Sequence, residues 1–106
     1  MRRGDVYWVE FPAPAGRRPA VLVSREEAYA VRSRVIVVPL TRTVRGIPTE
    51  VQLGPRDGLA HAGVANADEV VTIPKALLGK RIASLGRVRL EELDEALRFA
   101  LGLEKP

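Results

Sequence analysis

Cysteine is absent from this sequence of 106 residues, and histidine occurs only once, as His61. Without cysteine the chain can form no disulfide, no thiolate nucleophile and no cysteine-ligated zinc site. A single imidazole also excludes a metal site built from several histidines. These absences remove cysteine-dependent enzymes and most zinc enzymes from the classes to which the protein can belong.

Long apolar runs are missing as well. The longest cover residues 20–23 and 35–38, whereas a helix that spans a bilayer needs about 20 apolar residues. The basic start, residues 1–5, is not followed by the apolar stretch of a signal peptide. We therefore expect a cytoplasmic protein with no membrane segment, folded as a single domain over residues 1–106.

Basic side chains, in contrast, are plentiful and are mostly arginine. Arginine occurs fourteen times and lysine three times, the net charge is +4, and residues 1–49 carry nine basic side chains against four acidic ones. Guanidinium groups hold phosphate oxygens in pairs and stack on bases, so this excess favours a nucleic-acid partner. Genomic base composition or thermal adaptation would also enrich arginine, and composition alone does not separate these explanations.

Short β-branched and apolar segments between prolines and glycines predict a mainly β fold with a few helices. We expect strands over residues 6–11, 18–23, 34–40, 47–53, 63–66, 69–73 and 81–88. Segments 18–23 and 34–40 are apolar on both faces, which indicates a small closed barrel, or a sheet covered by a helix or by a second subunit. Segment 47–53 alternates, which is typical of a half-exposed strand, and Pro48 places its start at an edge.

One helix is predicted, over residues 90–102. Four leucines recur there at helical spacing, and Gly102 suits a C-terminal stop. Glu91 and Glu92 would lie in the first turn, where carboxylates complement the helix dipole. We expect the apolar stripe to cover the sheet, with a dimer contact as the alternative.

Conventional catalytic groups are scarce. His61 lies in a predicted turn without an obvious nucleophile, so we expect it to be structural or exposed rather than catalytic. Carboxylates stand side by side at residues 26–27, 68–69 and 91–92, but neighbours on a strand point to opposite faces and would not share a metal ion. The glycines form no phosphate-binding loop of the Walker or dinucleotide type.

Arginine and hydroxyl groups gather instead where predicted strands end, in residues 16–19 and 41–46. RNA carries its own nucleophile, the 2′-hydroxyl, so an enzyme that cleaves it needs mainly to hold the phosphate and stabilise the charge that develops there. A ribonuclease that uses no metal is therefore chemically feasible for this chain. The alternative is that these side chains cap strand ends and solvate the surface.

Five segments in order resemble the MazF/PemK family of ribonuclease toxins from toxin–antitoxin systems. They are residues 3–9, 16–24, 38–41, 47–51 and 68–73, and the likeness continues into the C-terminal helix. The resemblance implies a small SH3-like antiparallel β-barrel of the type shared by MazF and CcdB toxins, with a C-terminal helix. It also implies a homodimer, with a cognate antitoxin whose disordered C-terminal segment covers the RNA-binding surface.

The resemblance further implies a sequence-selective endoribonuclease that cleaves single-stranded RNA without a metal or cofactor, leaving 2′,3′-cyclic phosphate and 5′-hydroxyl ends. By position, Arg18 and Thr41 match the family's catalytic arginine and threonine. Positions that contact RNA in the family correspond to Pro48, Thr49, Asp68 and Glu69. From charge alone we add Arg17, Arg42 and Arg45 as phosphate-binding candidates.

Two features depart from the family pattern. The loop over residues 12–16 is short, and Glu69 replaces the glutamine of many members, so that a carboxylate that only accepts hydrogen bonds takes the place of an amide. Both changes bear on which RNA sequence is read. Arg18 is also a poor general base because a guanidinium stays protonated, and no other side chain is an obvious candidate.

Two other functions remain open from sequence. A CcdB-like gyrase inhibitor would have this fold without nuclease activity and would not need Arg18 or Thr41. A small barrel that binds RNA without cutting it would stack bases on exposed aromatic side chains. Tyr7 and Trp8 are the candidates, and we expect both to lie in the core or a dimer interface.

Overall fold

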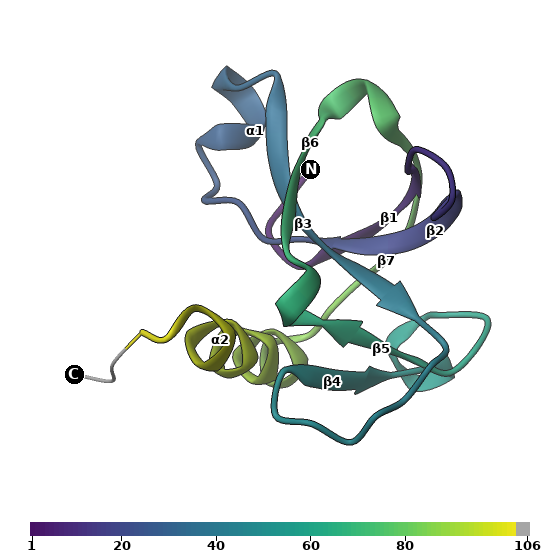
Figure 1. The fold of residues 1–106 in the computed structure, drawn as a ribbon. Helices are drawn as coiled ribbons and strands as arrows, with labels where there is room; N and C mark the ends of the chain where they lie inside the picture. The colour runs from purple at the N-terminus through teal and green to yellow at the C-terminus, as the bar shows by residue number, and fades with distance from the viewer. Residues whose placement is uncertain (104–106) are drawn as a thin grey trace.

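The computed structural model describes residues 1–103 and consists of one curved antiparallel sheet with a long helix against it (Figure 1). The elements in chain order are β1 (Asp5–Glu10), β2 (Arg17–Leu22), α1 (Ala28–Val31), β3 (Arg34–Thr41), β4 (Glu50–Leu53), η1 (Pro55–Asp57), β5 (Gly63–Asn66), η2 (Ala67–Glu69), β6 (Val71–Pro74), η3 (Lys75–Leu77), β7 (Leu78–Ser84) and α2 (Arg87–Leu101), where η marks a 3-10 turn. The strands run in the order β4-β5-β3-β2-β1-β7, and β6 pairs with β3. Within residues 1–103 no helix is both long and apolar enough to cross a membrane.

The expected mixture of a mainly antiparallel sheet and a few helices is confirmed, but the sheet does not close. Its two ends, β4 and β7, are not paired with each other. Strand β3 carries two partners along the same edge, β6 beside its first half and β5 beside its second. Helix α2 then packs against β4 and η2, and Figure 1 shows it at the opposite end of the fold from α1.

Two clusters of buried side chains explain why β2 and β3 are apolar on both faces. Val21 and Val38 belong to the cluster beneath α2, together with Leu93. Leu22 and Val37 lie in the other cluster, which also holds Tyr29 of α1. Each strand therefore buries alternate residues on opposite sides. A covered sheet, one of the alternatives left open by the sequence, accounts for the pattern.

Helix α2 begins at Arg87, three residues before the predicted start, and the predicted role of Glu91 and Glu92 is therefore wrong. No acidic residue lies in the first turn. The Glu91 carboxylate lies 3.7 Å from Arg87 Nε, and that of Glu92 lies 3.2 Å from Arg89 Nη1. Such exposed pairs stabilise a helix by only a few tenths of a kcal/mol, about 0.2–0.5. The predicted stop is confirmed, since Gly102 has a φ of 67°.

Three other predicted boundaries differ from the structure. Strand β4 begins at Glu50 rather than 47, because the carboxylate of Glu50 accepts hydrogen bonds from the backbone N–H groups of Arg45 and Gly46 and closes a local turn. Glu69 lies in the turn η2, not in a strand. The last strand is shifted toward the N-terminus, because β7 continues the β1 ladder from Leu78.

Tyr29 gives the fold a defined sensitivity to alkali. Burial, and secondarily the charge of Glu26, raises the pKa of its hydroxyl to about 12, and that hydroxyl donates to the Ser24 carbonyl at 3.0 Å. The unfolded chain releases this proton near pH 10, so unfolding is coupled to deprotonation and stability falls between about pH 10 and 12. We expect urea midpoints measured at pH 9 and 11.5 to fall less in Tyr29→Phe than in the wild type. Equal losses would contradict this assignment.

Candidate functional site

Arg18 and Thr41 lie just beyond the last pair of the β2–β3 ladder. The ladder runs through Val21 opposite Val38 and ends at Ala20 opposite Pro39, two residues short of Arg18 on β2 and of Thr41 on β3. Pro39 has no N–H to continue the ladder, so the strands are free to separate there. Both side chains line the same two pockets, so the guanidinium and the hydroxyl belong to one surface.

Beyond this point β3 turns to a different neighbour. Thr41 is paired with Val64 of β5, and the preceding residue, Leu40, is paired with Ala65. Thr41 is therefore held by β5 on one side, while its other side faces the space that β2 leaves open. A rigid sheet thus positions the hydroxyl, as suits a binding or catalytic group.

Two pockets meet at these two residues. A pocket of about 460 Å³ lies between the end of the β1–β2 hairpin and the loop before β5, and one of about 390 Å³ lies between that hairpin and η2. Among the described residues, only Arg18 and Thr41 line both. A group bound between these two side chains therefore lies where the two pockets adjoin.

The polar groups of Arg18 and Thr41 are largely available to a ligand. Arg18 Nη2 donates one hydrogen bond of 3.2 Å, to the Ala15 carbonyl. Thr41 Oγ1 accepts one of 3.3 Å from the Thr43 N–H, which leaves the hydroxyl proton free to be donated elsewhere. Within residues 1–103 no carboxylate pairs with the Arg18 guanidinium. Both side chains can therefore donate to the oxygens of a phosphate.

Most of the other predicted site residues line the same pockets. Arg17 and Arg42 line the larger one, and Arg45 and Glu69 the smaller one. Arg17 stacks on the Trp8 ring, 4.2 Å from its centre, and its Nε lies 3.4 Å from Glu10. Arg42 and Arg45 are exposed, and neither guanidinium pairs with a carboxylate within residues 1–103. The two pockets are therefore strongly basic, which favours the binding of phosphate groups.

Three predicted residues lie outside these two pockets. Thr49 is 3% exposed, and its hydroxyl donates to Asp68 Oδ2 at 2.8 Å. Asp68 is held in turn through its N–H, which donates to Asn66 Oδ1 at 2.9 Å. Both residues brace the turn that carries Glu69. Pro48 lines a separate groove against α2.

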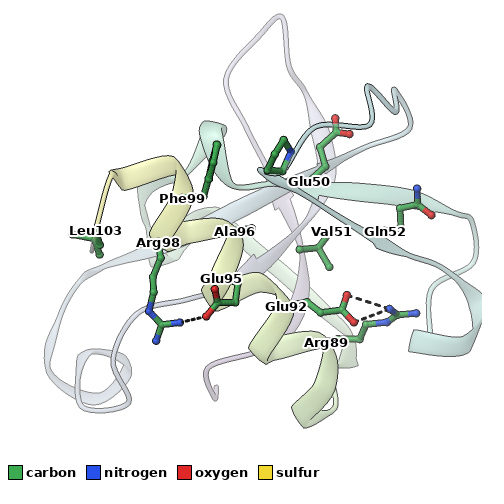
Figure 2. Close-up of a pocket in the computed structure, with 11 residues that line it drawn as sticks. Glu50, Val51, Gln52, Arg89, Glu92, Glu95, Ala96, Arg98, Phe99 and Leu103 are labelled. Atoms are coloured by element: carbon green, nitrogen blue, oxygen red, sulfur yellow. Dashed lines mark hydrogen bonds and ion pairs between the residues drawn. The ribbon is translucent and has the colours of Figure 1, made fainter. Parts of the chain in front are cut away.

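That groove, of about 770 Å³, lies between β4 and α2, and Figure 2 shows side chains from the two elements facing each other across it. The α2 side carries charge: Arg98 Nη1 lies 2.7 Å from Glu95 Oε1, and Arg89 pairs with Glu92. Arg89 also reaches Asp57 at 3.1 Å, and this hydrogen bond raises the pKa of the guanidinium above its usual value. Neither Arg18 nor Thr41 lines this groove.

The expectation that His61 is exposed is confirmed, but its side chain also forms part of a pocket wall. It lines the larger pocket together with Arg18 and Thr41. The sequence places His61 in a turn twenty positions after Thr41, and only the pairing of β5 with β3 brings the two together. Asn66 was missed for the same reason, and it lines the smaller pocket. Among residues 1–103 no three histidine, aspartate or glutamate side chains are grouped so as to hold a metal ion.

Gly63 lets β5 approach Thr41 closely. A Cβ at this position would lie 2.8 Å from the Thr41 carbonyl oxygen, a backbone atom that can move only by displacing β3. We expect Gly63→Ala to cost about 1–3 kcal/mol of stability, as overpacking does. Because a shift of about 1 Å at a catalytic group can cost about 10²-fold in rate, we expect RNA cleavage to fall by about that factor.

The matched control for this substitution is Gly54→Ala, whose Cβ would meet nothing closer than 3.7 Å. Both variants are to be compared with the wild type by thermal unfolding and by an RNA-cleavage time course. Full activity and stability in Gly63→Ala would contradict this prediction, because it would mean that β3 can shift away from the added Cβ without loss of stability or rate.

Comparison with known proteins places the chain in a family. The sequence profile of the family described as PemK-like, MazF-like toxin of type II toxin-antitoxin system matches residues 2–101. The probable endoribonuclease MazF5 of Mycobacterium tuberculosis is 37% identical over 100 residues, which cover 93% of this chain and 91% of the relative. Endoribonuclease MazF4 of the same species is 36% identical over 104 residues, 98% of this chain and 95% of the relative.

Solved structures agree. An endoribonuclease in complex with its cognate antitoxin, from a mycobacterial species, superposes with a TM-score of 0.86 at 34% identity and covers 100% of this chain and 99% of its own. The M. tuberculosis toxin MazF-mt6 gives a TM-score of 0.87 at 31% identity, and the match covers 95% of this chain and 99% of the toxin chain. By sequence and by fold, the chain belongs to the family of PemK-like, MazF-like toxins of type II toxin–antitoxin systems.

Proposed function

We propose that this protein is the toxin of a type II toxin–antitoxin pair and acts as a sequence-selective endoribonuclease on single-stranded RNA, without a metal ion. The observation that carries the proposal is the meeting of Arg18 and Thr41 at the junction of two basic pockets. The curated relatives compared above are named endoribonucleases, which supports the same activity.

The proposed reaction is a transesterification within the RNA. The 2′-oxygen attacks the neighbouring phosphorus, the bond from phosphorus to the 5′-oxygen breaks, and the products are a 2′,3′-cyclic phosphate and a 5′-hydroxyl. One proton leaves the 2′-hydroxyl and one is taken up by the departing 5′-oxygen, so the overall change is neutral. Negative charge grows on the non-bridging oxygens in the transition state, and Arg18 and Thr41 are placed to donate to them.

The remaining residues would bind the RNA on either side of the scissile phosphate. Arg17, Arg42 and Arg45 would hold flanking phosphates, since none of them lies deep in the fold. Glu69 would accept hydrogen bonds from a base edge or a sugar hydroxyl. Thr49 and Asp68 would act by holding the η2 turn. Pro48, from its place near α2, would contact a more distant nucleotide.

Partners are proposed on the same basis. A solved relative is an endoribonuclease in complex with its cognate antitoxin, and we propose that this chain is likewise inhibited by an antitoxin whose disordered C-terminal segment covers the basic pockets. We also propose that the active species is a homodimer.

The test of the nuclease function removes metal ions from the outset. Purified protein is incubated with a long single-stranded RNA in excess EDTA, and new 5′-hydroxyl ends are mapped by sequencing. We expect cuts at one short motif, with EDTA changing the rate less than two-fold and Thr41→Ala lowering it by about 10²-fold, the cost of one transition-state donor. Intact RNA together with inhibition of gyrase would replace the proposal with a CcdB-like activity.

A further inference from the structure

Cleavage of RNA requires two proton transfers that Arg18 and Thr41 do not perform. A base must remove the proton from the 2′-hydroxyl, and an acid must protonate the 5′-oxygen as it leaves. A guanidinium remains protonated at neutral pH, and a threonine hydroxyl takes up no proton there. Other groups must therefore serve as the base and the acid.

The two pockets supply one suitable group each. Apart from arginines, His61 is the only titratable side chain of the larger pocket, and Glu69 is the only one of the smaller pocket, among the described residues. Neither side chain forms a hydrogen bond or an ion pair within residues 1–103, and both are exposed. Both are therefore free to meet a substrate.

The arrangement matches the stereochemistry of the reaction. The entering 2′-oxygen and the departing 5′-oxygen stand on opposite sides of the phosphorus in an in-line displacement. Arg18 and Thr41 are the only described residues that line both pockets, so a phosphate held by these two side chains adjoins the pocket that His61 lines and the pocket that Glu69 lines.

We infer that Glu69 is the general base and His61 the general acid of the cleavage reaction, an assignment that rests on the proposed ribonuclease function. The Glu69 carboxylate takes the proton from the 2′-hydroxyl as the bond from the 2′-oxygen to phosphorus forms. The His61 imidazolium gives its proton to the 5′-oxygen as the bond from phosphorus breaks. A carboxyl group in water ionises near pH 4 and an imidazole near pH 6.5. A base must be deprotonated and an acid protonated at the same pH, and this order of ionisation allows both.

Charged neighbours of both groups are compatible with the roles. Arg17, Arg18 and Arg42 line the larger pocket with His61, and no carboxylate does. The phosphates of bound RNA would offset these three positive charges. In the smaller pocket Arg18 and Arg45 accompany Glu69.

The test uses a leaving group that needs no acid. A short RNA containing the mapped cleavage site is prepared in two forms, one natural and one with sulfur replacing the 5′-bridging oxygen, because a thiolate leaves without protonation. Single-turnover rates are measured for the wild type, His61→Gln and Glu69→Gln across pH 4–9. Glu27→Gln serves as a control, because Glu27 is an exposed glutamate beside α1 that lines none of these pockets.

We expect His61→Gln to cleave the natural RNA about 10²–10⁴-fold more slowly than the wild type and to recover on the sulfur-containing RNA. Glu69→Gln is expected to be slow on both. In the wild type the cleavage rate should fall at both ends of the pH range. The fall at high pH should vanish in His61→Gln and the fall at low pH in Glu69→Gln, whereas the profile of Glu27→Gln should match that of the wild type.

Each contrary outcome has a distinct meaning. Wild-type cleavage with unimpaired His61→Gln, or with equal losses on both RNAs, overturns the acid assignment while the ribonuclease function stands. An unimpaired Glu69→Gln overturns the base assignment in the same way. A wild type that cuts neither RNA overturns the proposed function and this inference together.

Discussion

Replacement of Arg18 with alanine is expected to lower the rate of RNA cleavage by about 10²–10³-fold, the usual cost of removing one preorganised donor from a developing oxyanion. The loss should appear in the single-turnover rate at saturating RNA, because the guanidinium binds the transition state more strongly than the ground state. The fold should survive, since the Arg18 side chain makes one hydrogen bond, to the exposed Ala15 carbonyl.

Arg32→Ala is the matched control for that experiment. Arg32 is an exposed arginine that caps α1 through its backbone, so its guanidinium can be removed without touching either pocket. A comparable loss in both variants would mean that bulk positive charge, rather than the contact at the junction of the pockets, accounts for the effect. Thermal unfolding of both proteins separates a catalytic loss from a failure to fold.

Truncation of Leu93 to alanine is the substitution expected to damage stability most. Leu93 is fully buried in the cluster that joins α2 to the sheet, and removing a buried leucine costs about 2–5 kcal/mol. A domain of this size has about 5–15 kcal/mol of stability in total. Chemical denaturation should therefore show a much lower midpoint with an unchanged slope.

Leu101→Ala makes the same chemical change near the end of the same helix. Leu101 is 56% exposed, so its truncation should change stability by about 0.5 kcal/mol or less. If both substitutions destabilised the protein equally, α2 would depend on its helical propensity and not on the contact with the sheet. The comparison measures how firmly the helix is docked.

Local patterns were enough to predict most strands but not where all of them begin. Runs of β-branched and apolar residues located β1, β2 and β3 correctly to within a residue or two. The start of β4 was misplaced because Ile47 continues the apolar alternation even though its backbone belongs to a turn. The start of α2 was missed because Val88, the apolar residue of its first turn, falls outside the leucine spacing and was included in the strand predicted over residues 81–88.

The site residues likewise fall into two groups: those that sequence motifs could identify, and those that only the folded structure brings to the site. Arg18 and Thr41 could be singled out from the family motifs, and both follow directly on the end of the β2–β3 pairing. His61 could not, because its position beside Thr41 depends on strand β5 crossing to β3. The sequence of this turn, residues 59–63, contains no pattern that predicts such a long-range pairing.

The stacking of Arg17 on Trp8 allows RNA binding to be followed by tryptophan fluorescence. Trp8 is the single tryptophan of the chain, and its indole both lines the larger pocket and lies 4.2 Å from the guanidinium carbon of Arg17. A nucleotide that draws Arg17 toward its phosphate or stacks in its place changes the polarity around the only indole. Intrinsic fluorescence of the unlabelled protein then follows the arrival of RNA, before any bond is cut.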